Sequence, residues 1–249
     1  PGRYPRGGRV HLRLWLAERL VDELGATNLS AAPLVRVYAK LLGCRVGRHV
    51  DLHSIPPVTG LLTLSTGCSI EPEVDLAGHW LDGGHVYIGA MAVGEEARVG
   101  ARSTLLPGAD IGDRAEVAPG SAVFGPVPAD EAWSGAPAGP SGAARGPWTP
   151  ERPPNRRVWV LAYAASAIGL ALVPVLAVLA GVTVALPELA AATDLAGLVT
   201  AALWWVPVAT AVGLVVLVGL VLGTVRLLSI GLEPGHHPVH GLRAWQAWS

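Results

Sequence analysis

Two histidines in one short segment, residues 77–87, are the side chains best suited to proton-transfer chemistry in this sequence. Histidine is the usual general base near neutral pH, and both His79 and His85 occur there. Asp75 and Asp82 flank His79 and could orient its ring, as carboxylates do beside a catalytic base, but spacing alone does not choose between them. A solvated loop histidine among surface aspartates is the alternative interpretation.

Trp80 follows the first of these histidines, and two roles for it stay open. It could form an apolar wall for a bound substrate, or it could anchor the segment to the body of the protein. Histidines also suggest zinc, which three of them can hold. The candidates would be His49, His53, His79 and His85, but their spacing is not compact, so no metal is predicted.

The segment interrupts a regular pattern that predicts the fold. Apolar residues recur every sixth position in two runs, which are Val46, Leu52, Val58, Leu64, Ile70 and Leu76, and then Val93, Val99, Leu105, Ile111, Val117 and Val123. Neither a helix nor a hairpin has a period of six. One apolar residue per short strand, pointing into a narrow prism, explains it. We therefore expect an all-β, left-handed parallel β-helix built from hexapeptide repeats.

Small residues support this expectation at the corners of the prism. In the second run the fourth residue after each apolar one is small, namely Ala97, Ser103, Ala109, Ala115 and Ser121. Cys68 occupies the equivalent position after Leu64 and is expected to be a small buried filler. The first run is less regular, because Val50, Leu62, Val74 and Trp80 are bulky at normally small positions.

Two helices are predicted before the repeats. Residues 10–24 carry apolar side chains near one face and end before a glycine, as an amphipathic helix does, and residues 33–42 form a shorter helical stretch. Either helix could lie on a membrane surface, but packing against the rest of this protein is the preferred interpretation.

The second half of the chain is strongly apolar. Of 249 residues, 51% are hydrophobic and 15% charged, and residues 158–186 and 198–225 carry no charged side chain. Each run is long enough to cross a bilayer, and a buried soluble hairpin is the alternative. Arginines precede the first run and follow the second, so the positive-inside rule places both ends in the cytoplasm.

Composition excludes some classes of function. The net charge of −1 offers no clustered basic face for nucleic acid. Two cysteines without a CxxC pair imply neither a disulfide framework nor a cysteine zinc site. His236, His237 and His240 lie in a proline-rich stretch and are expected to belong to a linker.

A short repeat suggests tandem modules. Residues 10–15 read VHLRLW and residues 239–245 read VHGLRAW, a match that needs one inserted glycine, although chance similarity is the alternative. The sequence starts with proline rather than with a signal peptide. We therefore expect a piece of a longer polypeptide, in which a second module begins near the end of this sequence.

Together these features predict five parts. They are N-terminal amphipathic helices (1–45), the β-helix (46–140) with its inserted loop (77–87), a Pro/Gly linker (141–157), a two-helix transmembrane hairpin (158–225) and the start of a following module (226–249). The predicted location is the cell membrane, with several spans and a cytoplasmic β-helix.

The repeats also resemble a known class of enzymes. Residues 41–52, LLGCRVGRHVDL, the stretch from residue 99 and its exit phrase WSGAPA resemble hexapeptide acyltransferases. With the membrane hairpin and the apparent second module, the chain resembles the membrane-embedded C-terminal region of ε-poly-L-lysine synthetase-type non-ribosomal peptide synthetases. The sequence contains no adenylation motif and no carrier-type serine motif, so this piece is not expected to activate an amino acid.

The resemblance implies peptide or isopeptide bond formation. A free amine of an amino acid or short peptide would attack an aminoacyl thioester, which a carrier domain outside this sequence holds on phosphopantetheine. No cofactor would be bound directly. Three sibling β-helix modules in one chain would form a pseudo-trimer beside the lipid membrane.

The resemblance also favours one histidine. Family members place a histidine-bearing loop near the acyl site, which makes His79 the preferred general base, with His85 as the rival and Asp75 as an orienting carboxylate. Trp80 would then line the path of the pantetheine arm. A non-catalytic β-helix that only scaffolds the assembly is the competing class, and a zinc-dependent carbonic-anhydrase-like protein is a remote alternative.

Overall fold

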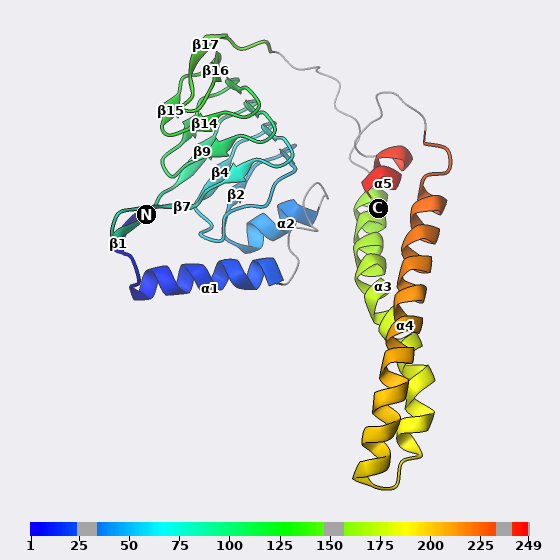
Figure 1. Cartoon of the computed structure of the whole chain (residues 1–249). Coiled ribbons are helices and arrows are strands. Elements are labelled where there is room, and N and C mark those ends of the chain that lie inside the picture. Colours follow the sequence, from blue (N-terminus) through cyan, green and yellow to red (C-terminus); the bar gives the residue numbers. More distant parts are fainter. Residues whose placement is uncertain (24–33, 147–156, 233–240, 249) are drawn as a thin grey trace. The chain divides into compact units, whose positions relative to one another are not determined.

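The computed structural model describes residues 1–23, 34–146, 157–232 and 241–248 (Figure 1). The chain divides into two compact units, Pro1–Arg152 and Pro153–Ser249, and each is described by itself.

Unit 1 is built around a three-sided stack of short parallel strands, here called the prism (Figure 1). One side contains β2 (Arg45–Val46), β4 (Leu62–Leu64), β9 (Met91–Val93), β12 (Asp110–Ile111) and β15 (Pro126–Val127). The second contains β3 (Asp51–Leu52), β5 (Ser69–Ile70), β10 (Arg98–Val99), β13 (Glu116–Val117) and β16 (Glu131–Ser134). The third contains β6 (Asp75–Leu76), β11 (Thr104–Leu105) and β14 (Ala122–Val123).

The strand register explains the period of six. Val99 of β10 lies between Ile70 of β5 and Val117 of β13 in parallel pairing, so equivalent residues of successive coils stack above one another. Val99, Leu105 and Ile111 are fully buried. The prediction that these apolar positions point inward is confirmed for the second run.

The corners of the prism follow the predicted pattern of small residues. Ala97, Ser103, Ala109, Ala115 and Ser121 are all buried, and so is Cys68, as predicted. The backbone also passes close to itself here, because a Cβ on Gly112 would lie 2.5 Å from the backbone nitrogen of Ala129. Glycine is therefore required at that corner.

The less regular first run follows the repeat except at Val58. Val50, Leu62 and Val74 are buried in the core although they are bulky, so the first coils accommodate them. Val58, however, lies outside any strand and is only partly buried. The expectation that Val58 is a regular inward-facing position is wrong, because residues 53–61 form an irregular connection between β3 and β4.

An additional element packs at each end of the prism. At the start, α2 (Leu34–Leu41) places Val35 and Ala39 in the same core as the first coils. At the other end, β17 (Gly139–Ala143) pairs antiparallel with β16. The bulk of the core therefore lies between a helix and an antiparallel ribbon.

The inserted segment forms a hairpin instead of a loop. Strands β7 (His79–Asp82) and β8 (His85–Ile88) pair antiparallel, and β1 (Gly2–Pro5) pairs antiparallel with the outer side of β8. The N-terminal strand β1 was not predicted, since GRYP has no strand pattern of its own. From β1 the chain enters α1 (Arg9–Glu23), which runs below the hairpin and the prism in Figure 1.

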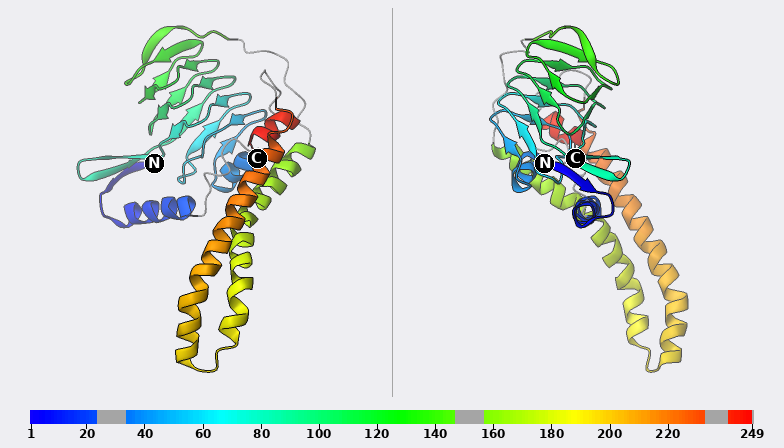
Figure 2. Two further views of the ribbon diagram at one scale, coloured as in Figure 1. Left: turned by 45° about the vertical axis from the view of Figure 1, so that its right-hand side comes forward. Right: turned by 90° about the vertical axis from the view of Figure 1, so that its left-hand side faces the viewer.

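Unit 2 consists of helices. α3 (Arg157–Ala190) and α4 (Leu195–Leu228) lie side by side in both views of Figure 2, and α5 (Leu242–Trp248) contacts α3 through a hydrogen bond from Trp245 Nε1 to Ser166 Oγ, 2.9 Å long. α3 continues beyond the uncharged run 158–186 and contains Pro187. Two helices, 158–190 and 195–228, are long and apolar enough to cross a membrane.

Candidate functional site

The candidate site is the point where α1 meets the base of the hairpin. His79 is the first residue of β7, and Glu18 lies in the third turn of α1. Glu18 Oε1 is 3.1 Å from His79 Nδ1. The side chains are 38% and 24% exposed, respectively, so the pair is partly shielded and still open to solvent on one side.

A cleft of about 220 Å³ opens beside this pair. Its lining residues are Glu18, Pro57, Val58, Thr59, Asp75, Leu76, Ala77, Gly78 and His79. The irregular connection between β3 and β4 therefore forms one wall, and the start of the insertion forms the other. The departure from the regular repeat in this region creates the space for the cleft.

The contact with Glu18 determines how His79 can act. A neutral imidazole carries one N–H, and the Glu18 carboxylate, 3.1 Å from Nδ1, favours the tautomer with that proton on Nδ1. The other ring nitrogen, Nε2, then keeps its lone pair and can accept a proton. This arrangement of a base and an orienting carboxylate is what general base catalysis requires.

Asp75 is a second carboxylate of the cleft, at the end of the prism wall. Burial against the cleft raises the pKa of Asp75 above its ordinary value, and the electrostatic effect of His79 partly opposes this rise. The carboxylate that contacts the imidazole ring is Glu18. Glu18 therefore occupies the orienting position that the sequence had suggested for Asp75 or Asp82.

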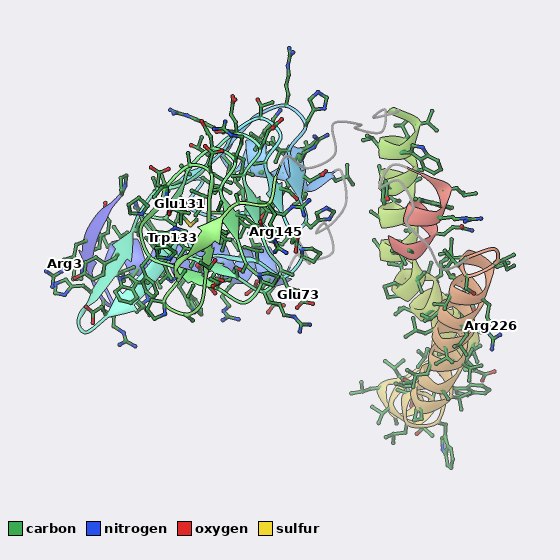
Figure 3. All side chains as sticks on the ribbon, turned by 90° about the horizontal axis from the view of Figure 1, so that it is seen from above. Arg3, Glu73, Glu131, Trp133, Arg145 and Arg226 are labelled. Carbon is green, nitrogen blue, oxygen red and sulfur yellow. The ribbon has the colours of Figure 1, made fainter. Side chains whose placement is uncertain are left out.

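His85 lies in a different place. The hairpin register sets His79 opposite Ile88 and Asp82 opposite His85, so the two histidines are at opposite ends of the hairpin. His85 Nδ1 is 2.9 Å from Arg3 Nη2. Figure 3 shows Arg3 beside the hairpin, far across the prism from Glu73.

Trp80 contacts aromatic side chains from two elements. Its ring centroid is 6.3 Å from that of Tyr87 in the hairpin and 6.4 Å from that of Phe124 on the prism. Arg3 also lies over the Tyr87 ring at 5.4 Å. Of the two roles considered for Trp80, these contacts favour the anchor, since they join the hairpin to the prism.

The histidines considered for zinc do not form a metal-binding group among the described residues. In the described parts of the chain, no three His, Cys, Asp or Glu side chains gather closely enough to hold an ion. His49 sits at a turn with a φ of 54°, and His53 follows β3. The predicted linker histidines His236, His237 and His240 lie outside the described residues.

Sequence reasoning missed Glu18. It lies in the amphipathic helix on the side of Leu14, the buried residue of α1. A carboxylate on the inward face of an amphipathic helix needs a polar partner. That signal was present in the sequence, but it did not identify the partner.

The prism and its His–Glu cleft define a hexapeptide-repeat module with a candidate general base. Over 140 residues the chain is 31% identical to Delta-poly-L-ornithine synthetase of Acinetobacter baumannii (strain AB307-0294), a match that covers 55% of this chain and 10% of that protein. This similarity confirms the resemblance to polyamino-acid synthetases inferred from the sequence. The chain spans about a tenth of the length of this curated relative.

Parts of two solved acetyltransferase structures are similar to part of this chain, with low TM-scores. Serine acetyltransferase of Neisseria gonorrhoeae is 24% identical, with 42% of this chain and 41% of that one covered and a TM-score of 0.36. Soybean serine acetyltransferase is 27% identical, with 40% of each chain covered and a TM-score of 0.35. No protein-family model matches the chain. The fold described above rests on the strand pairing of this chain.

Proposed function

We propose that this chain is a condensing module of a membrane-bound non-ribosomal peptide synthetase. It would join a free amine to an aminoacyl group held as a thioester on a carrier domain. The Glu18–His79 pair in its cleft is the observation that carries the proposal. The match to a polyornithine synthetase supports the reaction class.

The reaction needs a base because an ammonium group has no lone pair. In the proposed step, the amine nitrogen attacks the thioester carbonyl carbon, while His79 Nε2 takes a proton from that nitrogen. The C–N bond forms, the C–S bond breaks, and the released thiolate takes the proton from the imidazolium. Glu18 stabilises the transient imidazolium through Nδ1. The product is an amide or isopeptide.

The substrate arm would come from outside this chain. A carrier-bound phosphopantetheine thioester is treated as substrate, and no cofactor is assigned to the module itself. The cleft of about 220 Å³ is small for a whole aminoacyl arm. Its open side is where a carrier domain would deliver the thioester, and an amino acid or short peptide would supply the amine.

The proposal also includes the handedness of the coils, the membrane topology and the assembly of the modules. The coils would wind in the left-handed sense, and 158–190 and 195–228 would form a transmembrane hairpin. Arginines at 152, 156, 157 and 226 would hold both ends on the cytoplasmic side. Sibling modules would complete a pseudo-trimer, as the repeat of residues 10–15 at 239–245 suggests.

The test uses the full-length synthetase in membranes. His79→Ala should lower polymer formation by about 10²–10⁴-fold, the usual contribution of a general base, while the carrier is still loaded with its aminoacyl group. His85→Ala is the matched control, because it removes a histidine from the far end of the same hairpin. Carrier loading is measured separately by intact-protein mass spectrometry.

Product formation by His79→Ala at the normal rate would contradict the catalytic role. If a sibling module's equivalent variant abolished product instead, the module described here would be a non-catalytic scaffold. Loss of both product and carrier loading would indicate that the synthetase had misfolded. His79→Gln, which removes the base with less change in volume, would then test whether His79 is catalytic.

A further inference from the structure

Helix α1 has two faces of different character. Its inward face places Leu14 in a buried position, 8% exposed, and carries Glu18 to His79. Its outward face exposes four large apolar side chains, Leu12, Trp15, Leu16 and Leu20, which are 62%, 50%, 51% and 53% exposed, respectively. These residues follow at intervals of three, one and four, so they form one stripe along the helix.

Large apolar side chains are also exposed on α2 and the hairpin, at Val37, Leu41 and Leu81, but α1 carries four of them in one stripe. The prism buries its apolar residues in one core, and the exposed rings of Trp80 and Phe124 contact each other. The four side chains of α1 instead point away from the core that the rest of unit 1 forms. Contiguous exposed apolar surface of this kind marks an interaction site.

Basic residues border the stripe. Arg9 and Arg13 are exposed and lie on the same side of the helix, toward its first half, and Arg19 lies among the apolar residues. The exposed acidic residues Asp22 and Glu23 are confined to the last turn. The pattern of leucine, tryptophan and arginine on one surface is typical of helices that lie in a bilayer interface.

We propose that the outward face of α1 lies on the surface of an anionic lipid bilayer. The leucines and Trp15 would enter the headgroup and upper acyl region, and Arg9 and Arg13 would contact lipid phosphates. The same chain carries two helices long and apolar enough to cross a membrane, so a bilayer is the surface available to it.

This inference depends on the surface of α1 and not on the chemistry proposed for His79. It has one mechanistic consequence. The helix that holds the orienting carboxylate would also be the helix that rests on lipid, so the cleft would be fixed close to the membrane surface.

The test measures where α1 lies when the whole chain is in a membrane. A cysteine is introduced by Leu16→Cys on the stripe, and the environment-sensitive fluorophore NBD is attached to it. Cys44 and Cys68 are buried, and burial raises the pKa of both thiols, so the introduced cysteine is the one that reacts in the folded protein. Asp110→Cys, on an exposed position of β12, is the matched control.

Each labelled chain is reconstituted into vesicles of phosphatidylcholine with phosphatidylglycerol. The expected result is that spin-labelled lipids quench NBD at position 16 and that aqueous iodide does not, with the reverse at position 110. Replacing phosphatidylglycerol by phosphatidylcholine, or introducing Arg9→Gln with Arg13→Gln, should lower the lipid quenching by about half or more, since each arginine contributes separately to binding.

Three outcomes would contradict the proposal. Iodide quenching at position 16 as strong as at position 110 would mean that the stripe faces water. Protection of position 16 from both quenchers would mean that a protein surface covers it, such as a second copy of this unit. Lipid quenching that did not depend on phosphatidylglycerol would contradict the proposed contact of Arg9 and Arg13 with an anionic bilayer. The polymerisation assay for His79 is independent of all three results.

Discussion

Glu18 Oε1 lies 3.1 Å from His79 Nδ1, although the two residues belong to elements widely separated in the chain. The contact exists because β1 pairs with the hairpin that His79 begins and because the chain then turns into α1. The orientation of the candidate base therefore depends on the N-terminal strand and helix, which lie outside the repeats.

Replacing the orienting carboxylate should slow the reaction without abolishing it. An ion pair between partly exposed side chains contributes up to about 1 kcal/mol, which corresponds to up to about fivefold in rate. Glu18→Gln should therefore lower kcat for polymer formation by that factor, with carrier loading unchanged. Glu23→Gln, an exposed carboxylate at the end of the same helix, serves as the control. Equal activity of both variants would remove Glu18 from the mechanism.

The aromatic contact between Trp80 and Phe124 should stabilise the hairpin against the prism. Aromatic pairs contribute about 0.5–1.5 kcal/mol beyond buried area, and their ring centroids here are 6.4 Å apart. A double-mutant cycle with Trp80→Ala and Phe124→Ala should give a coupling free energy in that range, measured by urea denaturation with pulse proteolysis in detergent. Strictly additive effects would show that Trp80 does not anchor the hairpin.

Two aspartates should affect stability with opposite signs as pH changes. Burial raises the pKa of Asp75, so the folded state binds its proton more readily than the unfolded chain does. The free energy of unfolding then falls as pH rises from about 3.9, the ordinary value, to the raised pKa. Asp75→Asn should be more stable than the parent chain at pH 7, and this difference should disappear in acid.

Asp130 provides the contrast. The Arg114 guanidinium donates hydrogen bonds of 2.6 and 2.7 Å to its carboxylate, and this contact lowers the pKa of Asp130. Its stabilising contribution is present above the ordinary pKa and is lost as pH falls through the lowered one. Asp130→Asn should therefore be less stable at pH 7, with no difference in strong acid. The same sign for both variants in pH-dependent unfolding would contradict this interpretation.

The corner at Gly112 should not tolerate a side chain. A Cβ there would lie 2.5 Å from the nitrogen of Ala129, and forcing atoms into a packed site costs about 1–3 kcal/mol. Gly112→Ala should lower the free energy of unfolding by that amount. At Gly125 a Cβ meets nothing within 4 Å, so Gly125→Ala should change it by less than about 0.5 kcal/mol.

Buried thiols should be unreactive in the native chain. Burial raises the pKa of Cys68 to about 12, and a thiol at that value forms almost no reactive thiolate near pH 8. Maleimide should therefore modify neither cysteine until the chain is unfolded, as followed by intact mass. Labelling of Cys68 at a rate typical of an exposed thiol would mean that the corner it fills is open.

The repeating part of the fold could be predicted because its physics is local and periodic. Each short strand must bury one apolar side chain. The spacing of six therefore suffices to predict that Val99, Leu105 and Ile111 are buried. The same reasoning failed at Val58, where the chain leaves the strand geometry and lines the cleft. A regular pattern thus predicts the prism but not the place where the prism is interrupted.

The site was only partly predictable for a related reason. His79 and Asp75 are neighbours in sequence, and both line the cleft. Glu18 reaches it through tertiary packing, which depends on the pairing of Arg3 with Tyr87 between β1 and β8. Strand pairing across such a distance leaves no periodic signal, and the strand GRYP contains a glycine and a proline, which are uncommon in strands.

The antiparallel ribbon at the end of the prism also affects solubility. A stack of parallel coils that simply stopped would present a row of free backbone groups, to which another chain could add its own strand. Strand β17 occupies that edge on the side that ends in β16, and its Pro140 has no backbone N–H with which to pair an added strand. With α2 packed on the core at the opposite end, β17 leaves one fewer strand edge open to edge-to-edge aggregation.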